Sequence, residues 1–468
     1  MKSLKHTYPY IILILSLFIY SCEDFVDLDP PSDQLIGEEV FKNQATVESA
    51  LIGIYHQLFQ LDYSGGGRSS IATLAGISAD NIQNISSGNI SRMQFQEHEI
   101  DPDNVDNLNT WSSAYNMVYA TNSFLEGLEN TENLDQEFKQ QMAGQVLFVR
   151  AFTYFFLVNL YGDVPLVLST DYRANQLASR SSQNAVYDQI LADLVLALEQ
   201  APQEYINGER ISVNRQVVRA FLSRVYLYME NWQEAEKYST QVINDTGNYQ
   251  LMEDLNQVFL ANSLEAIWQI SPIGAGGLAT QTNEGNFLII DPIFSFFAAV
   301  KLEETFVSEF DTIDKRLQNW VGYNESLDAH YVHKYKIRLS NVFPILEYSM
   351  VLRLSEQYLI RAEARARQGD LTGAIEDIDK IRTRAGLELL ADINPDLSQE
   401  ELLTEILSQR RKELFAEWGH RWFDLKRLGL ANQVLGGNDP LWEDTDIFYP
   451  IPEDERKKNP NLTQNEGY

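Results

Sequence analysis

The fold of this chain is decided by residues 352–387, LRLSEQYLIRAEARARQGDLTGAIEDIDKIRTRAGL. In the first half, apolar and small residues recur at steps of three and four, which predicts one buried face of a helix. Gly369 suits the left-handed residue that ends a helix, and the Asp370 side chain can cap the next helix, which repeats the spacing up to Gly386. Small residues, which let two helix backbones approach closely, stand at Ala362, Ala364, Ala366 and Ala374. The stretch therefore predicts a helical hairpin of the tetratricopeptide type.

A second hairpin of the same design is predicted earlier in the chain. Residues 217–229 and 232–243 both have helical periodicity, and Asn231 between them can act as a cap, with Glu234 placed to complete a capping box. Further helices are predicted at residues 47–61, 111–128, 137–160 and 186–198, and a short strand at 264–270. The two hairpins lie on either side of residues 271–345, which lack helical periodicity. The predicted fold class is mostly α: a tetratricopeptide-like helical scaffold with long irregular ligand-binding loops and an inserted loop-rich region.

The first 21 residues have the form of a signal peptide. Lys2 and Lys5 precede an apolar run from Ile11 to Tyr20, which is shorter than the roughly 18 residues needed to span a bilayer. Cys22, the only cysteine of the chain, follows this run directly, in a position that resembles a bacterial lipobox. We therefore expect Cys22 to be the lipidated N-terminus of the mature protein, anchored by acyl chains such as palmitate.

Acidic residues follow the cysteine: Glu23, Asp24, Asp27 and Asp29. They resemble the export signal that sends bacterial lipoproteins to the outer face of the outer membrane, so we expect residues 22–36 to form the lipidated N-terminus and an acidic tether. The whole chain is acidic as well, with 67 Asp and Glu against 36 Lys and Arg and a net charge of −31. Such a surface repels nucleic acid, anionic lipid and polyanionic ligands, and it suits neutral ligands or partners with basic patches. A solvated acidic surface without a specific role explains the charge equally well.

Four stretches along the chain carry a family resemblance. They are VRAFTYFFLVNLYGDVPLV (149–167), RAEARARQGDLTGAIEDIDKIRTRAGL (361–387), ILSQRRKELFAEWGHRWFDLKRLG (406–429) and YPIPEDERKKNPNLTQNEGY (449–468). Together with the lipoprotein-like start, they resemble the SusD/RagB-like outer-membrane nutrient-binding lipoproteins over nearly the whole mature chain. Gln409 and Glu466 depart from the residues usual in that family, Glu and Pro, and both lie in structural motifs.

The resemblance implies a fold and a function. The fold is SusD-like, with an N-terminal helical part at residues 37–270 and a C-terminal part at residues 271–468, in which the loop-rich insertion 271–345 precedes hairpins and an extended tail at 346–468. The function is that of a cell-surface lipoprotein, held in the outer membrane and facing the exterior. It binds oligosaccharide or polysaccharide nutrients and delivers them to a TonB-dependent outer-membrane transporter (SusC-like), over whose lumen it sits as a lid. Nucleic acid is not an expected partner.

Two loop regions hold the candidate ligand residues. Three successive glycines before Arg68 predict a loop, and Asp80 and Asn81 lie in a segment that resembles one lining the family's ligand site. In the insertion, aromatic residues stand without helical periodicity, where their rings could stack on the apolar faces of sugars while Asn, Asp and Arg bond the hydroxyls. These aromatic residues are Phe287, Phe294, Phe296, Phe297, Trp320, Tyr323, Tyr331 and Tyr335. We predict Trp320 and Tyr323 as stacking residues and Arg68, Asp80 and Asn81 as polar contacts; the alternative is that each packs beneath its own loop.

The sequence contains no nucleophile elbow, phosphate-binding loop or zinc motif, so we expect no enzyme activity, no catalytic residue, no cofactor and no metal site. Asp101–Asp106 lacks the central glycine of a calcium loop, and His330 and His333, three residues apart, lack further ligands. The charged residues of 410–427 are explained by pairing along a helix. Two alternatives stay open. One is a surface glycoside hydrolase, which needs only two carboxylates about 5 to 10 Å apart. The other is a peptide-binding member of the same transporter system.

Overall fold

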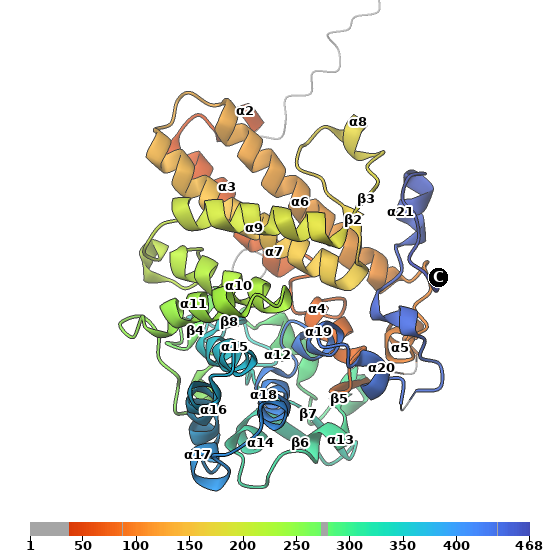
Figure 1. Cartoon of the computed structure of the whole chain (residues 1–468). Coiled ribbons are helices and arrows are strands. Elements are labelled where there is room, and N and C mark those ends of the chain that lie inside the picture. Colours follow the sequence, from red (N-terminus) through yellow and green to blue (C-terminus); the bar gives the residue numbers. More distant parts are fainter. Residues whose placement is uncertain (1–36, 87, 273–278, 438) are drawn as a thin grey trace, which may run out of the picture.

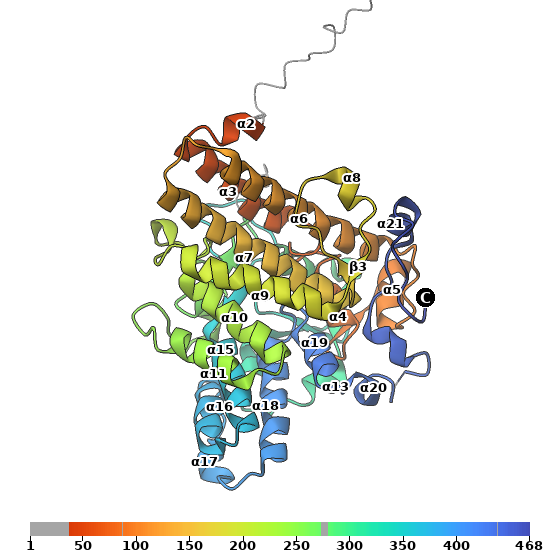
Figure 2. The same cartoon turned by 45° about the horizontal axis from the view of Figure 1, so that its top comes forward.

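The scaffold is a continuous stack of antiparallel helices (Figure 1). The computed structural model describes residues 37–86, 88–272, 279–437 and 439–468, so the predicted signal peptide, Cys22 and the tether lie outside the described residues. In both views α3, α6, α7 and α9 lie at one end of the molecule and α16, α17 and α18 at the other (Figure 2). The long helices are α3 (Gln44–Gln60), α6 (Val105–Asn130), α7 (Gln136–Tyr161), α9 (Gln183–Gln200), α10 (Arg215–Tyr228), α11 (Trp232–Ile243), α15 (Leu354–Arg367), α16 (Leu371–Ala385) and α18 (Gln399–Leu414).

Short helices and strands fill the loops between these long helices. The short helices include α2 (Gly37–Val40), α4 (Ile71–Ile77), α5 (Ile90–Gln96), α8 (Tyr172–Asn175), α12 (Asn283–Leu288), α13 (Glu304–Val307), α14 (Lys315–Trp320), α17 (Leu390–Ile393), α19 (His420–Arg427), α20 (Ala431–Val434) and α21 (Glu453–Lys458). The strands pair in antiparallel twos: β1 (Ile82–Asn84) with β5 (Val300–Leu302), β2 (Val164–Pro165) with β3 (Arg180–Ser181), β4 (Ala266–Ile270) with β8 (Ser349–Arg353), and β6 (Val321–Asn324) with β7 (Ala329–Val332).

Both predicted hairpins are confirmed, and they pack on each other. Gly369 has a φ of 87°, and the Asp370 side chain accepts from the Gly373 amide at the start of α16. One face of α15 packs on α16 and α18, and a second face, with Ile360 and Ala364, packs on α10 and α11. The small residues of α15 thus let it pack closely on two sides. This contact joins the α10–α11 hairpin to the α15–α16 hairpin, more than 100 residues later in the sequence.

The helix predicted at residues 137–160 is α7, and most of the residues in its second half are buried, including several aromatic ones. This helix is long and apolar enough to cross a membrane, but 89 % of its most apolar window is buried inside the protein. Phe148 and Phe152 pack edge-on against Trp268 of β4, with ring centroids 5.1 and 5.2 Å apart. An apolar helix covered on all sides is a core element, and α7 is the buried helix of the end of the molecule formed by α3, α6, α7 and α9.

The strand predicted at 264–270 is confirmed as β4, and its partner β8 immediately precedes α15. The pairing of Ile270 with Ser349 brings together the two ends of the loop-rich segment predicted as an insertion. The division of the chain into two parts at residue 270 stays a prediction. The tail at 449–468, predicted to be extended, also contains the short helix α21. It is fixed to the end of α7, where the Asn465 amide donates to the Tyr161 carbonyl.

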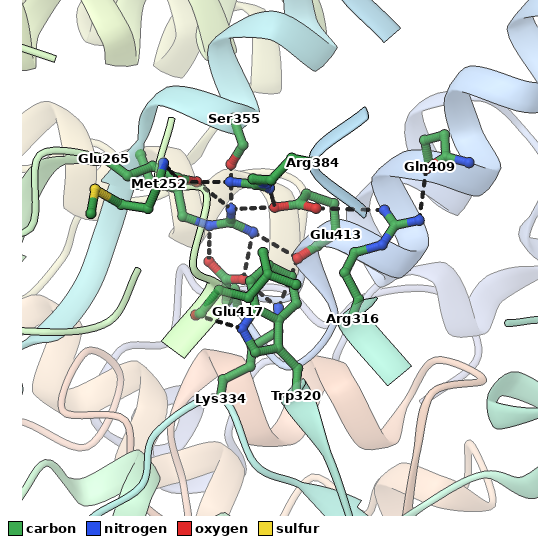
Figure 3. A network of polar contacts seen from close by, with 12 residues as sticks. Met252, Glu265, Arg316, Trp320, Lys334, Ser355, Arg384, Gln409, Glu413 and Glu417 are labelled. Carbon is green, nitrogen blue, oxygen red and sulfur yellow. Dashed lines mark hydrogen bonds and ion pairs between the residues drawn. The ribbon is translucent and has the colours of Figure 1, made fainter. Parts of the chain in front are cut away.

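A buried cluster of charges lies where β4, β8, α16 and α18 meet (Figure 3). Its centre is Arg353, whose guanidinium bonds Glu417 at 2.8 Å, Glu413 at 2.6 Å and Glu265 at 3.0 Å. Arg384 on α16 also forms ion pairs with two of these carboxylates, those of Glu265 and Glu413. Burial raises the pKa of Glu413, but the charges of Arg384, Arg353 and Arg316 outweigh it and hold this pKa well below its usual range. The charges of the cluster are therefore paired with one another in the protein interior.

The charged residues of 410–427 mostly pair with other elements, so the prediction that they pair along one helix is wrong. Arg421 bonds Asp80, which precedes β1, and Arg427 bonds Glu363 of α15. Only the contact of Arg427 with Asp424 has the spacing of neighbours on one helix, among the pairs of this segment that the structure describes. The partners of Arg421 and Arg427 lie more than 60 residues away in the chain, so the sequence alone could not identify these ion pairs.

Replacing Arg353 by Met should lower the free energy of unfolding by about 3–5 kcal/mol, because three buried carboxylates lose a cation while remaining in the core. The measurement is urea denaturation of the mature chain, followed by circular dichroism. Arg173→Met, on the exposed face of α8, is the matched control and should change stability by no more than about 0.5 kcal/mol. Equal effects of the two substitutions would show that the cluster does not hold the fold together.

Candidate ligand-binding site

A cavity of about 470 Å³ lies between the loop that follows α3 and the first part of the insertion. Its lining combines aromatic rings with amide, guanidinium and carboxylate groups. The lining residues are Gly67, Arg68, Asn283, Asn286, Phe287, Ile289, Asp291, Phe294, Phe297, Ala298, Ala299 and Arg338. Arg68 is the predicted site residue that lines this cavity.

The loop carrying Arg68 is held tightly against α12. Gly66 has a φ of 74°, and a Cβ atom at this residue would lie 2.1 Å from the Glu284 carboxyl carbon. The Asn283 amide donates to the Gly65 carbonyl at 2.7 Å and to the Phe59 carbonyl at 3.3 Å. The run of glycines is therefore needed for close backbone approach as well as for the turn.

One rim of the cavity is a cluster of phenylalanines. Phe296 and Phe297 are 71 and 72 % exposed, and their ring centroids lie 4.4 Å apart. Phe294, half exposed, lies 6.1 Å from Phe296. Solvent-exposed rings beside polar groups form the kind of surface on which the apolar face of a sugar can stack. The signal in the sequence is the segment Asp291–Phe297, which places three phenylalanines after an Asp-Pro turn.

The polar groups of the cavity are positioned by Asp291. One carboxylate oxygen accepts from the amides of Ile293 and Phe294, which shapes the turn, and the other bonds the Arg338 guanidinium at 2.9 Å. The Phe294 and Ile293 amides lower the pKa of Asp291, as does the charge of Arg338. The Asn286 amide donates to the Arg338 carbonyl at 3.2 Å. Asp291, Arg338 and Asn286 are candidate contacts that the sequence did not single out.

Trp320 does not lie at this cavity, and its prediction as a stacking residue is wrong. The side chain is fully buried, and the indole nitrogen donates to the Leu255 carbonyl at 3.0 Å. Its ring faces cations of the charge cluster, with the Lys334 nitrogen 4.8 Å and the Arg353 and Arg384 guanidinium carbons 5.6 and 5.8 Å from its centroid. The aromatic face is thus occupied by the protein's own cations.

Asp80 and Asn81 connect β1 to α18 and α19. Asn81 is buried and accepts from Arg411 at 2.7 Å, so its prediction as a ligand contact is wrong. Asp80 receives two hydrogen bonds from Arg421, at 2.7 and 2.8 Å. Burial raises the pKa of Asp80. The hydrogen bonds from Arg421 and the charges of Arg411 and Arg421 lower it by more, so this pKa lies below its usual value. Asp80 does not line the cavity, and its role as a ligand contact stays a prediction.

Tyr323 is exposed on the β6–β7 hairpin, away from the lining of the cavity. Its hydroxyl donates to Asp328 at 2.5 Å, and its ring lies 5.0 Å from that of His330. His330 in turn bonds Glu304, and burial lowers the pKa of His333 to about 4. Among the residues that the structure describes, no group of three His, Cys, Asp or Glu side chains is arranged to hold a metal ion. Tyr323 as a ligand contact stays a prediction.

A second cavity, of about 390 Å³, lies between α3 and β4. Its walls are largely apolar, and they include Leu51, Ile52 and Trp268. The Tyr55 hydroxyl at this cavity is already used, because it donates to Gln145 and accepts from the Val213 amide. A sugar needs several available hydrogen-bonding groups, so the cavity at Arg68 is the better candidate for a carbohydrate.

Beneath the Arg68 loop, burial raises the pKa of Glu284 to about 7, with smaller contributions in the same direction from Glu347 and Glu417. The Ser349 hydroxyl donates to one carboxyl oxygen, and the other has no hydrogen-bond partner among the described residues. Because the folded protein holds this proton more tightly than the unfolded chain, the stabilisation is complete below about pH 4.5 and is lost as the pH rises through 7.

The stability of the wild type relative to Glu284→Gln should therefore fall between pH 5 and pH 8 by on the order of 3 kcal/mol. The measurement is urea denaturation of both proteins across this range. Taking the difference between the two proteins removes the titration of Lys334 and other groups that both share. A stability difference that does not change with pH would contradict a raised pKa of Glu284 in the folded protein.

Comparison with known proteins identifies the family. One family model, described as starch-binding and associating with the outer membrane, matches residues 24–227, and a second, the SusD family, matches residues 340–468. SusD-like protein P2 of Formosa agariphila is 27 % identical, with 99 % of this chain and 100 % of that protein covered. The fold matches a SusD superfamily protein from Bacteroides vulgatus with a TM-score of 0.80 at 22 % identity, over 91 % of this chain and 99 % of that one.

A laminarin-binding SusD-like protein also has this fold, with a TM-score of 0.77 at 21 % identity over 91 % of this chain and all of the other. These structural matches confirm the predicted mostly α, SusD-like fold. Both family models, one in each half of the chain, and the full-length relative agree with the motifs seen in the sequence. The chain therefore belongs to the SusD/RagB family of carbohydrate-binding proteins that associate with the outer membrane.

Proposed function

We propose that this protein binds oligosaccharides or polysaccharides at the cavity beside Arg68 and delivers them to a TonB-dependent outer-membrane transporter. The observation that carries the proposal is the combination of exposed phenylalanines with guanidinium and amide groups around one cavity of about 470 Å³. Rings supply stacking surfaces for sugar faces, and the polar groups supply hydrogen bonds to hydroxyls. The starch-binding description of the matching family model and the laminarin-binding relative support glycan as the cargo.

In this proposal the protein binds glycan without cleaving it. Glycoside hydrolysis needs two carboxyl groups on either side of the scissile bond. Among the described residues that line the cavity, Asp291 is the single carboxylate, and it is held by Arg338 and two backbone amides. A peptide-binding role within the same transporter system is the alternative, because exposed rings also bind peptide side chains.

The first test is calorimetric titration of the mature chain with starch and laminarin oligosaccharides and with peptides, each mixture also being assayed for cleavage. We expect glycan binding without cleavage, weakened by roughly threefold to tenfold in Phe297→Ala because a stacking surface is lost. Tyr172→Ala, which removes an exposed ring on α8, is the control and should bind normally. Cleavage would support a hydrolase, and a response to peptides alone would support the peptide-binding alternative.

We also propose that Cys22 carries the lipid anchor and that the protein faces the cell exterior. Cys22→Ala should abolish labelling with palmitate and move the protein from the outer-membrane fraction to the soluble fraction, because the acyl chains supply the membrane affinity. Protease added to intact cells should degrade the wild type. Continued membrane association of the Cys22→Ala protein would contradict this anchor.

A further inference from the structure

The cavity beside Arg68 is locally cationic, although the chain carries a net charge of −31. Arg68 and Arg338 line it, and a third guanidinium, that of Arg92 on α5, lies 5.3 Å from the centroid of the Phe287 ring in its wall. The carboxylate of Asp291 compensates Arg338 alone, through the 2.9 Å ion pair. Two positive charges therefore remain without a bonded carboxylate at this site.

Arg92 differs from the other deeply buried arginines. Its side chain is 3 % exposed, and its Nε and Nη1 atoms have no hydrogen-bond partner among the described residues. By contrast, Arg224 bonds Glu356 at 2.6 Å and Arg410 bonds Asp424 at 2.9 Å. A buried charge without a bonded counter-ion is costly, because it loses hydration and gains little in return.

Arg68 is also without a partner. Its side chain is exposed on the loop that Asn283 holds against α12, and the structure records no hydrogen bond or ion pair for it within the described chain. Burial lowers the pKa of the Arg92 guanidinium, the Asp106 carboxylate acts in the opposite direction, and the like charge of Arg68 lowers it further. The charge of Arg68 therefore acts against that of Arg92, in opposition to the attraction of Asp106, and an anion bound at Arg68 would reduce this repulsion.

We propose that the cavity selects glycans that carry an anionic group, a carboxylate or a sulfate ester, which binds at Arg68 and is attracted by the buried charge of Arg92. This inference rests on the proposed glycan-binding function and names its substrate class. A planar guanidinium bonds carboxylate and sulfate oxygens in a two-pronged geometry, while the neighbouring rings of Phe294 and Phe297 stack on the sugar. The negative surface of the remaining protein does not prevent this, because charges further away than about 8 Å are largely screened at physiological salt.

The experiment compares glycans that differ only in charge. A galacturonate hexasaccharide is paired with its fully methyl-esterified form, and a κ-carrageenan hexasaccharide with its desulfated form. The mature chain without its lipidation site, residues 23–468, is titrated with all four by calorimetry, and neutral laminarin and starch oligosaccharides complete the panel. We expect at least one charged member to bind about tenfold or more tightly than its neutral counterpart. The galacturonate pair reports a carboxylate site and the carrageenan pair a sulfate site.

Variants locate the preference. Arg68→Gln should remove most of the preference for the charged member, and Arg68→Lys should restore part of it, because the charge returns without the planar geometry. Arg173→Gln, which removes an exposed arginine on α8, should leave the preference unchanged. Raising the salt concentration should weaken binding of the charged member more than that of its neutral counterpart.

The outcomes separate this inference from the proposed function. Equal binding of both members of each pair, or tighter binding of the neutral ones, would overturn the anionic preference and leave glycan binding intact. A preference that persists in Arg68→Gln would overturn its assignment to this cavity. Absence of binding to every glycan of the panel would overturn the proposed function itself.

Discussion

The buried guanidinium of Arg353 is the interaction on which the rest of the structure depends. It contacts the carboxylates of Glu265 just before β4, of Glu413 in α18 and of Glu417 just after α18, so segments separated by up to about 150 residues meet at one side chain. Charges taken out of water are stable only where each one is paired with good geometry. Every element that brings a member of the cluster is therefore held to one position relative to the others, including β8, which closes the loop-rich segment, and the first turn of α15.

The helical scaffold could be predicted from the sequence because its signals are local. Periodicity, Gly369 and the cap at Asp370 define the hairpin within 36 residues, and the structure reproduces it. Asn231 likewise caps α11, although Glu234 there bonds Lys237, and the structure records no return bond to complete a capping box. The short helices of the insertion were not predicted, because segments of four to six residues carry less than two turns of periodicity.

The candidate site was harder to predict because it depends on contacts between distant segments. Arg68, which the preceding glycines place in a loop, lines the cavity, and its role as a ligand contact stays a prediction. Trp320 was chosen among eight aromatic residues of similar sequence context. The residues next to it in the sequence do not show that Lys334 and Arg353 lie over its ring in the folded protein. The same limit applies to charge. The composition suggested that polyanions are repelled, whereas the structure places Arg68 and Arg338 in the wall of one cavity and Arg92 against the Phe287 ring of that wall.

The pairing of β4 with β8 has a consequence for how relatives of this protein can diverge. Because Ile270 and Ser349 are bonded neighbours, the segment between them begins and ends at one fixed point of the scaffold. The entropic cost of closing such a segment grows only with the logarithm of its length, about 0.6 kcal/mol for each doubling. Apart from Arg316, Trp320 and Lys334, which reach the buried charge cluster, residues of the exposed loops can therefore be added, removed or exchanged here with little effect on the helices that carry the fold. The helical scaffold and the β4–β8 pair can therefore stay constant while the exposed loops between these two strands differ from one relative to another.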